Sequence, residues 1–561
     1  MAGLLVRGGP VHTGDPARPV VDALAVVDGV VVARGEAALH AVGRGAQVID
    51  LAGGCALPGF RDGHIHPLSG GVGLAAAPLA TASTLGELFE VIRTFADEHP
   101  DQRWITGGGY LPTLAPDGQF DAAWLDAVVP DRPAVLMATD YHTAWANTAA
   151  LERAGIDAGT PDPARGQIVR RADGTPQGTL REAAVDLVTR YVPPLGEPDK
   201  QAGLRRAMAL LAGHGIVAVQ EAALEQADLG VYLDLAAAGG LPMDVAVALR
   251  VEPDSWREQL EEFAAARSTA DQAAAQSGPP GPGHGRRARV RARTVKLFAD
   301  GVIEAGTAHM LEPYAGEPPT GTPLTGGQGC GHLPDTGLPN FSPAELAEVV
   351  TAFDARGWQV HVHAIGDAAV RSALDAVDAA QRANGPRDRR AVIAHTQVVH
   401  PQDVHRFARL GVVANFEPLW AQQDSVMVEL TEPRLGAHRS GRQYPIGELL
   451  ASGARVSFGS DWPVTSAAPL EGICTAVTRQ TDTGQPPGGW QPEQRVTLAE
   501  ALAAYTSGTA YQCFDDTAGR LVEGAPADFV VLDADLSRVP ARELADVPVL
   551  STWRAGERTT P

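Results

Sequence analysis

The sequence predicts an α/β protein built on a (β/α)8 TIM barrel, with a small β-sandwich made from both termini and a large insertion after the first barrel strand. Three observations lead to this prediction. Eight short apolar runs alternate with helix-like stretches, the first two runs are separated by an unusually long gap, and Val-rich segments stand at both ends of the chain. Alternating strands and helices imply a parallel sheet, and eight parallel strands can close into a barrel.

The expected barrel strands are short runs that end in glycine, a polar residue or a candidate ligand. They cover residues 56–60, 217–220, 245–249, 294–298, 359–362, 392–394, 412–415 and 456–458. Stretches rich in Ala, Leu and Glu, such as residues 343–356 and 368–381, supply helices between them. Catalytic groups in this fold lie at the carboxyl ends of the strands, so the residues that end each run are the first candidates for a site.

Two further regions complete the predicted architecture. The segment from residue 70 to about 200 is too long for one connection, so it is expected to form an insertion with its own structure. Val-rich strands are expected at residues 23–27, 30–33 and 529–532. The expected domains are the first part of the β-sandwich at 1–56, the barrel at 57–505 with the insertion or cover at 70–200, and the last part of the β-sandwich at 506–561.

The charge of the chain argues against nucleic acid and membrane partners. The chain has 561 residues and a formal net charge of -22 at pH 7, which repels phosphates. Residues 268–293 look like an exposed linker, and we interpret their basic run as a solvated loop. The run contains Arg286, Arg287, Arg289, Arg291 and Arg293.

The remaining composition predicts a cytoplasmic protein that acts on a small molecule, as a monomer or a homo-oligomer. The sequence shows no apolar span long enough for a membrane helix and no signal-peptide pattern. Its four cysteines are widely spaced and match neither a disulfide framework nor a zinc ribbon. They are Cys55, Cys330, Cys474 and Cys513.

One strand-like run delivers two histidines separated by a single residue, His64 and His66. Alternate residues of an extended strand point to the same side, so both imidazoles can reach one metal ion. Neutral imidazole suits zinc or a similar first-row ion. The pair alone is weak evidence, but four later runs also end in a residue that can complete a metal site. Those residues are Lys296, His363, His395 and Asp461.

The order His-x-His, Lys, His, His, Asp on successive strands resembles the amidohydrolase superfamily over nearly the whole chain. Within it, the sequence is most similar to amidohydrolase family 3, which contains N-substituted formamide deformylases and exoenzyme-regulatory-like proteins. The similar text is Pro58-Gly59-Phe60, His363-Ala364-Ile365-Gly366-Asp367, Gly459-Ser460-Asp461-Trp462-Pro463-Val464 and Ala527-Asp528-Phe529-Val530-Val531-Leu532.

The resemblance implies a divalent metal cofactor, one ion or two, with zinc as the first choice. One ion would be held by His64, His66 and Asp461, and a second by His363 and His395. Lys296 would bridge them after carboxylation by carbon dioxide, because an ordinary ammonium has no lone pair. The alternative for this lysine is a salt-bridged or snorkelling side chain, although an unpaired charge among its apolar neighbours would be costly.

The predicted reaction is hydrolysis of a non-peptide carbon–nitrogen bond, in an amide or N-formyl group, by a metal-activated hydroxide. Asp461 is expected to take the proton of the attacking water and pass it to the leaving amine. Two alternatives stay open. The same barrel can hydrolyse an ester, lactone or phosphoester, or the chain can be a catalytically silent regulator that uses the barrel for binding.

Four further residues bear on the site. His142 lies in the insertion and resembles a family segment at the barrel mouth, so it is expected to bind the substrate carbonyl or leaving group unless it is a surface histidine. Glu304 is a candidate for orienting a ligand or substrate nitrogen. His361 shares a strand face with His363, but the family text selects the latter as the ligand. Many family members have Glu where this chain has Ala394, so a supporting contact to the next histidine must come from elsewhere.

Overall fold

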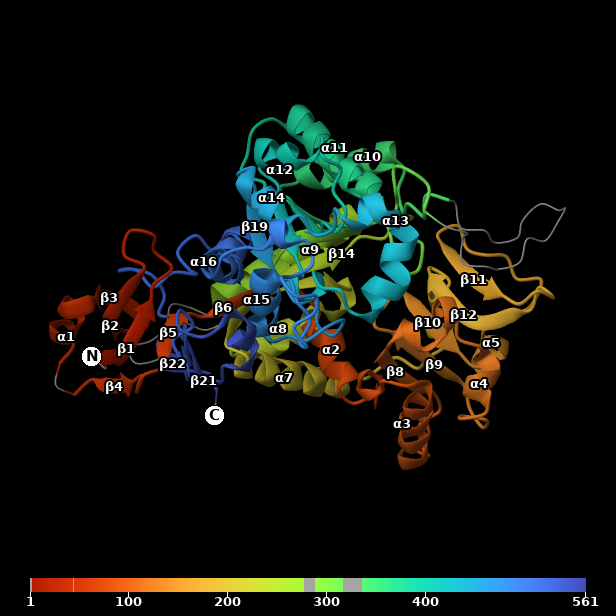
Figure 1. Ribbon diagram of the computed structural model, residues 1–561, viewed down its shortest axis with the longest axis horizontal. Coiled ribbons are helices and arrows are strands. Elements are labelled where there is room, and N and C mark those ends of the chain that lie inside the picture. The colour runs from red at the N-terminus through yellow and green to blue at the C-terminus, as the bar shows by residue number, and fades with distance from the viewer. Residues whose placement is uncertain (1–2, 44, 277–287, 316–334, 561) are drawn as a thin grey trace.

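The centre of the molecule is a nearly closed barrel of eight parallel strands with helices packed outside it (Figure 1). The computed structural model describes residues 3–43, 45–276, 288–315 and 335–560. The strands follow one another in chain order, as expected of a (β/α)8 fold, and this confirms the predicted parallel barrel. They are β6 (Phe60–Ile65), β13 (Ile216–Leu224), β14 (Asp244–Arg250), β15 (Val290–Phe298), β16 (Gln359–Ala364), β17 (Val392–His395), β18 (Val413–Phe416) and β19 (Arg455–Phe458).

The helices cover the outside of the barrel, so its strands are buried on both faces. All six residues of β16 are buried, for example. This pattern is typical of a parallel sheet packed against helices. The main helices are α7 (Glu197–Gly213), α8 (Leu229–Ala237), α9 (Trp256–Gln276), α10 (Pro343–Ala355), α11 (Asp367–Asn384), α12 (Val404–Leu410), α14 (Ile446–Ala451) and α15 (Pro469–Thr478).

The first and last barrel strands meet just beyond their carboxyl ends. The backbone N–H of Asp461 donates to the carbonyl of His64 at 2.7 Å, and the N–H of His66 donates to the carbonyl of Trp462 at 2.9 Å. Gly459 leaves room for this approach, since a Cβ there would lie 2.6 Å from the His64 nitrogen. Closure of the barrel therefore brings two candidate ligands, far apart in the sequence, next to each other.

The first barrel strand differs from its predicted range of 56–60. It begins at Phe60, whereas the preceding residues form β5 (Cys55–Pro58), which pairs with β20 (Phe529–Leu532) in another sheet. The apolar run is continuous through both strands, so the change of sheet is hidden in the sequence. Gly59 stands at the change, where a Cβ would lie 2.5 Å from Val217.

The predicted exposed linker at 268–293 is wrong in the parts that the structure describes. Helix α9 continues to Gln276, and strand β15 begins at Val290. From that strand onward, arginines alternate with buried apolar residues, a period-two pattern that the neighbouring Pro and Gly residues obscured. Outside the described residues lie 277–287, with Arg286 and Arg287.

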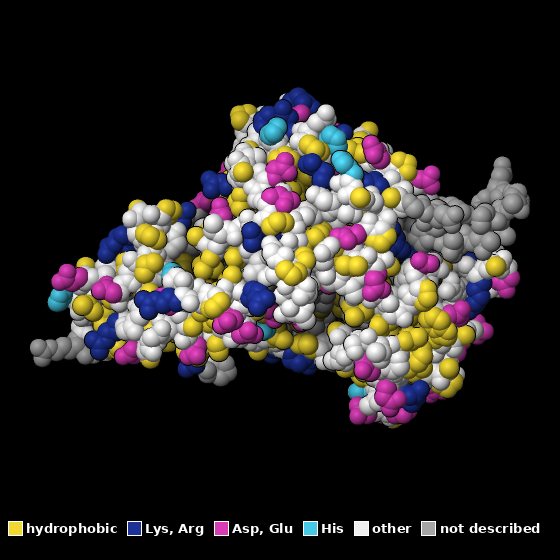
Figure 2. Space-filling model, viewed as in Figure 1, with side chains coloured by type: hydrophobic (Ala, Val, Ile, Leu, Met, Phe, Trp, Pro, Cys, Tyr) yellow, Lys and Arg dark blue, Asp and Glu magenta, His cyan; other side chains and the backbone are white. Residues whose placement is uncertain are grey.

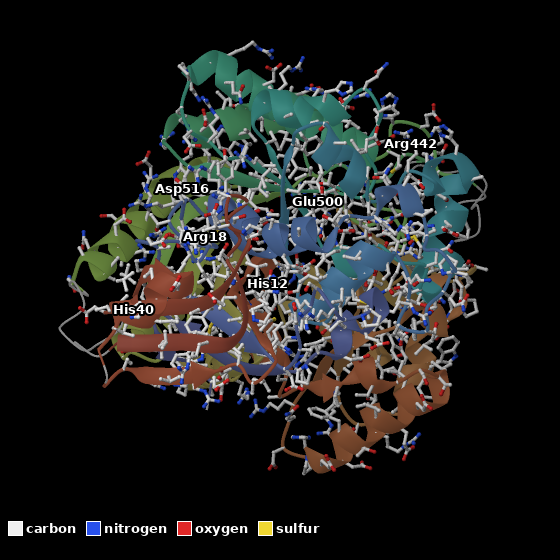
Figure 3. The ribbon with its side chains drawn as sticks, turned by 60° about the vertical axis from the view of Figure 1, so that its left-hand side comes forward. His12, Arg18, His40, Arg442, Glu500 and Asp516 are labelled. Carbon is white, nitrogen blue, oxygen red and sulfur yellow. The ribbon has the colours of Figure 1, made fainter. Side chains whose placement is uncertain are left out.

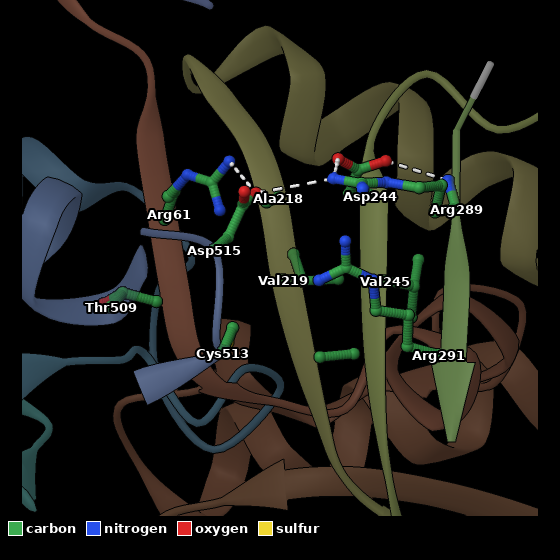
Figure 4. A pocket seen from close by; sticks show the side chains of 11 residues that line it. Arg61, Ala218, Val219, Asp244, Val245, Arg289, Arg291, Thr509, Cys513 and Asp515 are labelled. Carbon is green, nitrogen blue, oxygen red and sulfur yellow. Dashed lines mark hydrogen bonds and ion pairs between the residues drawn. The ribbon is translucent and has the colours of Figure 1, made fainter. Parts of the chain in front are cut away.

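The arginine at the start of this strand joins an ion-pair cluster at the amino end of the barrel (Figure 4). Arg289 lies 3.6 Å from Asp244 and 3.7 Å from Asp515, and Arg61 lies 3.0 Å from Asp515. The cavity among these side chains measures about 20 Å³, which is room for about one water molecule. Arg289 is thus paired within the protein, beside a space too small for a substrate.

Strands from both termini form a second sheet beside the barrel (Figure 1). Its order is β22-β21-β20-β5-β1-β2-β3, with β4 alongside β1. Val6, Leu24 and Phe529 belong to a separate apolar core on it, and His12, labelled in Figure 3, lies 3.0 Å from Asp535. The strands not yet given are β1 (Gly3–His12), β2 (Val20–Val27), β3 (Val30–Arg34), β4 (Gln47–Asp50), β21 (Val549–Arg554) and β22 (Glu557–Arg558).

A third sheet lies between β6 and β13 in the chain and at the opposite end of the molecule from the terminal sheet (Figure 1). Its order is β11-β12-β10-β9-β8-β7, and separate apolar clusters around Trp145 and Leu180 pack on it. Its strands are β7 (Ala77–Pro78), β8 (Ile105–Tyr110), β9 (Ala134–Ala138), β10 (Thr143–Ala146), β11 (Gly166–Arg170) and β12 (Pro176–Glu182).

The three predicted domain ranges and the small β-sandwich stay predictions, and contacts cross both proposed boundaries. Strand β5 lies in the terminal sheet, and the side-chain amide of Gln512 donates to the carbonyl of Gly63 in the barrel at 2.7 Å.

On the face in Figure 2, Lys and Arg side chains lie in small groups among acidic ones. Within the described ranges, no helix has both the length and the apolar character needed to cross a bilayer.

Candidate metal centre

All six predicted ligands meet at the carboxyl end of the barrel. His64 lies near the end of β6 and Asp461 just beyond β19, and His64 Nε2 is 3.7 Å from Asp461 Oδ1. His66 Nε2 is 3.0 Å from the same oxygen. The other three come from β15, β16 and β17, where the rings of His363 and His395 have centroids 4.4 Å apart and Lys296 is fully buried.

His64, His66 and Asp461 offer three ligand atoms that all lie within 4.8 Å of one another. Asp461 Oδ1 is buried and lacks a hydrogen bond of good geometry. Burial disfavours a charged His66, but Asp461 and Glu221 outweigh this and raise the pKa of His66 to about 9. A divalent cation would take the place of that proton. Two imidazoles and a carboxylate therefore fit a first-row cation.

His363 and His395 lie beside this group but are held by other contacts. His363 Nε2 is 3.1 Å from the carbonyl of Gly301, and His395 Nδ1 is 2.9 Å from Glu417 Oε2. The His395 ring also stacks on Trp420, with a centroid distance of 5.3 Å. Among the described residues, only His64, His66 and Asp461 form a group of three or more His, Cys, Asp or Glu side chains whose ligand atoms all lie within 4.8 Å of one another. A second ion bound at Nε2 of His363 would replace its contact with the carbonyl of Gly301.

Lys296 has an unusual environment for a charged amine. Its Nζ lies 3.1 Å from His64 Nε2 and 4.8 Å from the centroid of the Phe298 ring. Burial lowers the pKa of Lys296 to about 8, and the charges of Asp461 and Glu417 offset this only in part. Contact with an imidazole rather than a carboxylate disfavours the salt-bridged alternative for this lysine.

His361 orients the first histidine of the centre. Its Nε2 lies 2.9 Å from Nδ1 of His64, which leaves Nε2 of His64 directed toward Lys296 and Asp461. Burial lowers the pKa of both His64 and His361 well below the ordinary value, with the charge of Lys296 acting in the same direction. The neutral ring that a metal ligand needs is thus the favoured form.

Three acidic residues around the centre were missed in the sequence. Glu417, just after β18, contacts His395 and so supplies the support that Ala394 cannot. Glu221 Oε1 on β13 lies 3.5 Å from His66 Nδ1, and Asp62 accepts from the backbone N–H of His64 at 3.0 Å. Glu221 directly follows the predicted strand at 217–220, and Glu417 lies two residues beyond the predicted strand at 412–415. The strand-end rule that found the ligands would have found these two as well.

The insertion reaches the barrel mouth through Tyr141 and His142. The His142 ring lies 5.2 Å from that of His363 and 6.2 Å from that of Phe298, measured between centroids, and its side chain is 17% exposed. Burial and the charge of Asp461 raise the pKa of Tyr141 to about 12. His142 therefore lies beside the centre and is not an isolated surface histidine.

Glu304 lies near this region without joining the centre. Burial and the charge of Asp140 raise its pKa to about 7, whereas the charge of His142 acts in the opposite direction. Within the described part of the chain, no hydrogen bond or ion pair links Glu304 to the six predicted ligands. Its expected role in orienting a ligand stays a prediction.

Left-handed backbone at non-glycine residues recurs around the centre. The φ angle is 53° at Tyr141, 52° at Glu182, 69° at His395 and 53° at Asp461. L-amino acids seldom adopt this conformation, and such strain collects at functional sites where the surroundings enforce it. Tyr141 and Glu182 belong to the insertion, so the insertion shares this feature with the barrel part of the site.

Comparison with known proteins gives one consistent result. A model described as amidohydrolase family matches residues 47–560. The protein LONG AFTER FAR-RED 3 of Arabidopsis thaliana is 30% identical over 100% of this chain and 92% of its own length. The N-substituted formamide deformylase of Arthrobacter pascens is 26% identical over 91% of this chain and 89% of its own. An uncharacterized metal-dependent hydrolase from Pyrococcus furiosus has a crystal structure that matches with a TM-score of 0.68 and 26% identity, covering 95% of this chain and 99% of that one.

Proposed function

The chain belongs to the amidohydrolase family, and from this premise we propose that it hydrolyses a non-peptide carbon–nitrogen bond, in an amide or an N-formyl group. The family and the solved relative support a metal-dependent hydrolase. The observation that carries the proposal is the group of His64, His66 and Asp461, whose ligand atoms all lie within 4.8 Å of one another at the carboxyl end of the barrel. The similarity to a formamide deformylase supports the bond class.

In this proposal, His64, His66 and Asp461 hold a divalent cation, with zinc as the first choice. Such a cation polarises a carbonyl group and lowers the pKa of water. Lys296, buried beside His64, would carry a carboxylate made from carbon dioxide and so offer oxygen ligands in place of an ammonium. A second cation would use this carboxylate together with His363 and His395.

Asp461 is proposed to move the proton. Burial opposes its charged form, but the contact with His66 outweighs burial and lowers the pKa of Asp461, so it is a carboxylate at neutral pH. A carboxylate can accept the proton of an attacking water and return it to the leaving amine. His361 and Glu417 meanwhile hold the rings of His64 and His395 in fixed orientations.

The two alternatives differ in how they relate to these residues. Ester, lactone or phosphoester hydrolysis would use the same centre, so a substrate panel is needed to separate it from amide hydrolysis. A silent regulator would have no need for a strained carboxylate such as Asp461, whose φ of 53° is enforced beside the candidate ligands. The geometry therefore favours an enzyme.

The test combines metal content with a matched substrate panel. The purified protein is loaded with zinc, manganese or iron, and metal per chain is measured by mass spectrometry. Turnover is then measured on N-formyl amines, anilides, and the corresponding esters, lactones and phosphoesters. We expect at least one ion per chain and turnover of an amide or N-formyl compound. Loaded protein that hydrolyses only esters would overturn the bond class, and failure to hydrolyse anything would favour the regulator.

A further inference from the structure

We propose that Glu182 is a positioning residue, which holds His142 so that its Nε2 donates a hydrogen bond to the carbonyl oxygen of the substrate. This inference rests on the proposed hydrolase function and deepens it. It assigns part of the active site to the insertion rather than to the barrel. Neither residue lies at a barrel strand end, so the rule that identifies the metal ligands does not reach them.

Two hydrogen bonds connect Glu182 and His142. The Oε2 atom of Glu182 lies 2.8 Å from Nδ1 of His142, and the backbone N–H of Glu182 donates to the carbonyl of His142 at 2.8 Å. His142 stands just before β10, and Glu182 ends the neighbouring strand β12. The sheet therefore sets the two side chains together at one edge. Because Nδ1 is occupied, Nε2 is the ring nitrogen left for a ligand.

The second oxygen of Glu182 anchors the pair to the barrel. Glu182 Oε1 accepts from the hydroxyl of Thr307 at 2.6 Å, and that hydroxyl accepts from the N–H of Val302 at 2.9 Å. Thr307 is fully buried and lies in the loop after β15. Both carboxylate oxygens are thus engaged, one by the insertion and one by the barrel. This arrangement leaves the carboxylate little freedom to turn.

Gly301 makes the close packing possible. A Cβ at this position would lie 2.0 Å from Glu182 Oε1 and 2.3 Å from the hydroxyl oxygen of Thr307. The carbonyl of the same glycine lies 3.1 Å from Nε2 of His363. The carboxylate therefore packs on a residue whose backbone carbonyl contacts a candidate ligand, and the left-handed φ of 52° at Glu182 indicates that the position is enforced.

The placement of His142 suits contact with the carbonyl rather than the leaving group. Its ring lies against that of His363, with centroids 5.2 Å apart. With Asp461 serving the leaving amine, His142 is left to serve the carbonyl oxygen, where negative charge develops during attack. Glu182 holds Nδ1, so Nε2 is the ring nitrogen that can meet this oxygen. A donor aimed at such an oxygen commonly contributes about 10²–10³-fold to kcat.

Kinetics of single and double variants test the inference. We expect His142→Ala to lower kcat by about 10²–10³-fold and Glu182→Ala by about 10–100-fold. For each variant, the loss of kcat should be the same on an anilide as on its matched aryl ester, because the carbonyl is common to the two substrates. In the His142→Ala background, Glu182→Ala should have no further effect. Glu152→Gln, an exposed change in the same insertion, is the matched control and should behave as the parent.

Binding supplies a readout that does not depend on turnover. Methylphosphonate, a tetrahedral anion, is titrated calorimetrically into the zinc-loaded parent and the variants at equal metal content. We expect its Kd to rise about tenfold or more when either His142 or Glu182 is removed. If the parent has no hydrolytic activity and the Kd for methylphosphonate still depends on His142 and Glu182, the proposed function fails and the positioning role stands.

Two results would overturn the inference. The first is losses from His142→Ala and Glu182→Ala that multiply in the double variant, because Glu182 would then act independently of His142. The second is unchanged kinetics and unchanged methylphosphonate binding in Glu182→Ala. If that variant does not fold, Glu182→Gln and Thr307→Val replace it. They weaken the charge or the anchor without emptying the space, and each must lower kcat only when His142 is present.

Discussion

The two ends of the barrel use buried polar groups in opposite ways. At the amino end, Arg61, Asp515 and their neighbours form ion pairs around a cavity of about 20 Å³ (Figure 4). At the carboxyl end, Asp461 lies among imidazoles, with Oδ1 3.0 Å from His66 Nε2, and burial lowers the pKa of His64, which favours its neutral form. Opposite charges that pair with one another stabilise a fold, whereas neutral imidazoles and a carboxylate gathered at strand ends can bind a ligand.

The largest expected effect is a difference in kcat between variants at the two ends of the barrel. Asp461→Asn keeps an oxygen that can touch a cation but cannot accept a proton at neutral pH, so amide turnover should fall by about 10²–10⁴-fold. An aryl ester should suffer less, because its leaving group needs no proton. Asp515→Asn, the same change at the amino end, should leave kcat of the folded protein unaltered. The measurement is kcat on both substrates at equal metal content, and equal small losses would remove Asp461 from proton transfer.

Stability should show the reverse pattern. Arg61 is 2% exposed and lies 3.0 Å from Asp515 and 3.6 Å from Asp528. Removing one partner of a buried ion pair costs about 3–5 kcal/mol, since the other charge is left buried. Arg61→Met should therefore lower the free energy of unfolding in urea by that amount. Arg93→Met, which breaks an exposed pair with Glu90, should cost about 0–1 kcal/mol. Equal small costs would mean that the cluster is not needed for stability.

Lys296 tests whether the carboxyl end needs an added anion. If carbon dioxide supplies a ligand there, Lys296→Ala should lower metal affinity and kcat by about 100-fold or more. A short carboxylic acid such as acetate should restore part of both by filling the vacated space. Lys296→Arg should also fail, because a guanidinium has donors only. A fully active Lys296→Ala variant with normal metal content would contradict this role.

The smallest expected effect is on the pH dependence of the unfolding free energy of the metal-free protein. The folded pKa of His66 is raised from 6.5 to about 9, so its stabilisation is complete below pH 6.5 and is lost as the pH rises through 9. The difference in unfolding free energy between the parent and His66→Gln should therefore shrink by about 1–3 kcal/mol over this range. Zinc-loaded parent, in which the cation replaces the proton, should lack this decline. The curves are obtained from urea titrations, and parallel curves for the metal-free proteins would refute the assignment.

Much of the barrel could be predicted because its signals are local. An apolar run with period-two side-chain placement forms a strand wherever it lies, and the carboxyl ends of parallel strands meet at one rim. His64 and Asp461 were therefore placed together correctly, although almost the whole chain separates them. The family assignment is confirmed by the match over residues 47–560. The prediction failed where a local pattern was ambiguous, as at the change of sheet at Gly59 and in the basic run before β15.

The sequence by itself determined the barrel, its order of strands and the residues at the strand ends, because these depend on short-range periodicity and on chain direction. The strand-end rule also points to Glu417, but tertiary structure alone decided which imidazole each supporting carboxylate contacts. Glu417 replaces the contact that Ala394 cannot make, and Glu182 meets His142 across two strands of the insertion. Such pairs depend on how separate elements pack and turn against one another. A carboxylate within hydrogen-bond reach of an imidazole is a property of that packing, and no spacing along the chain encodes it.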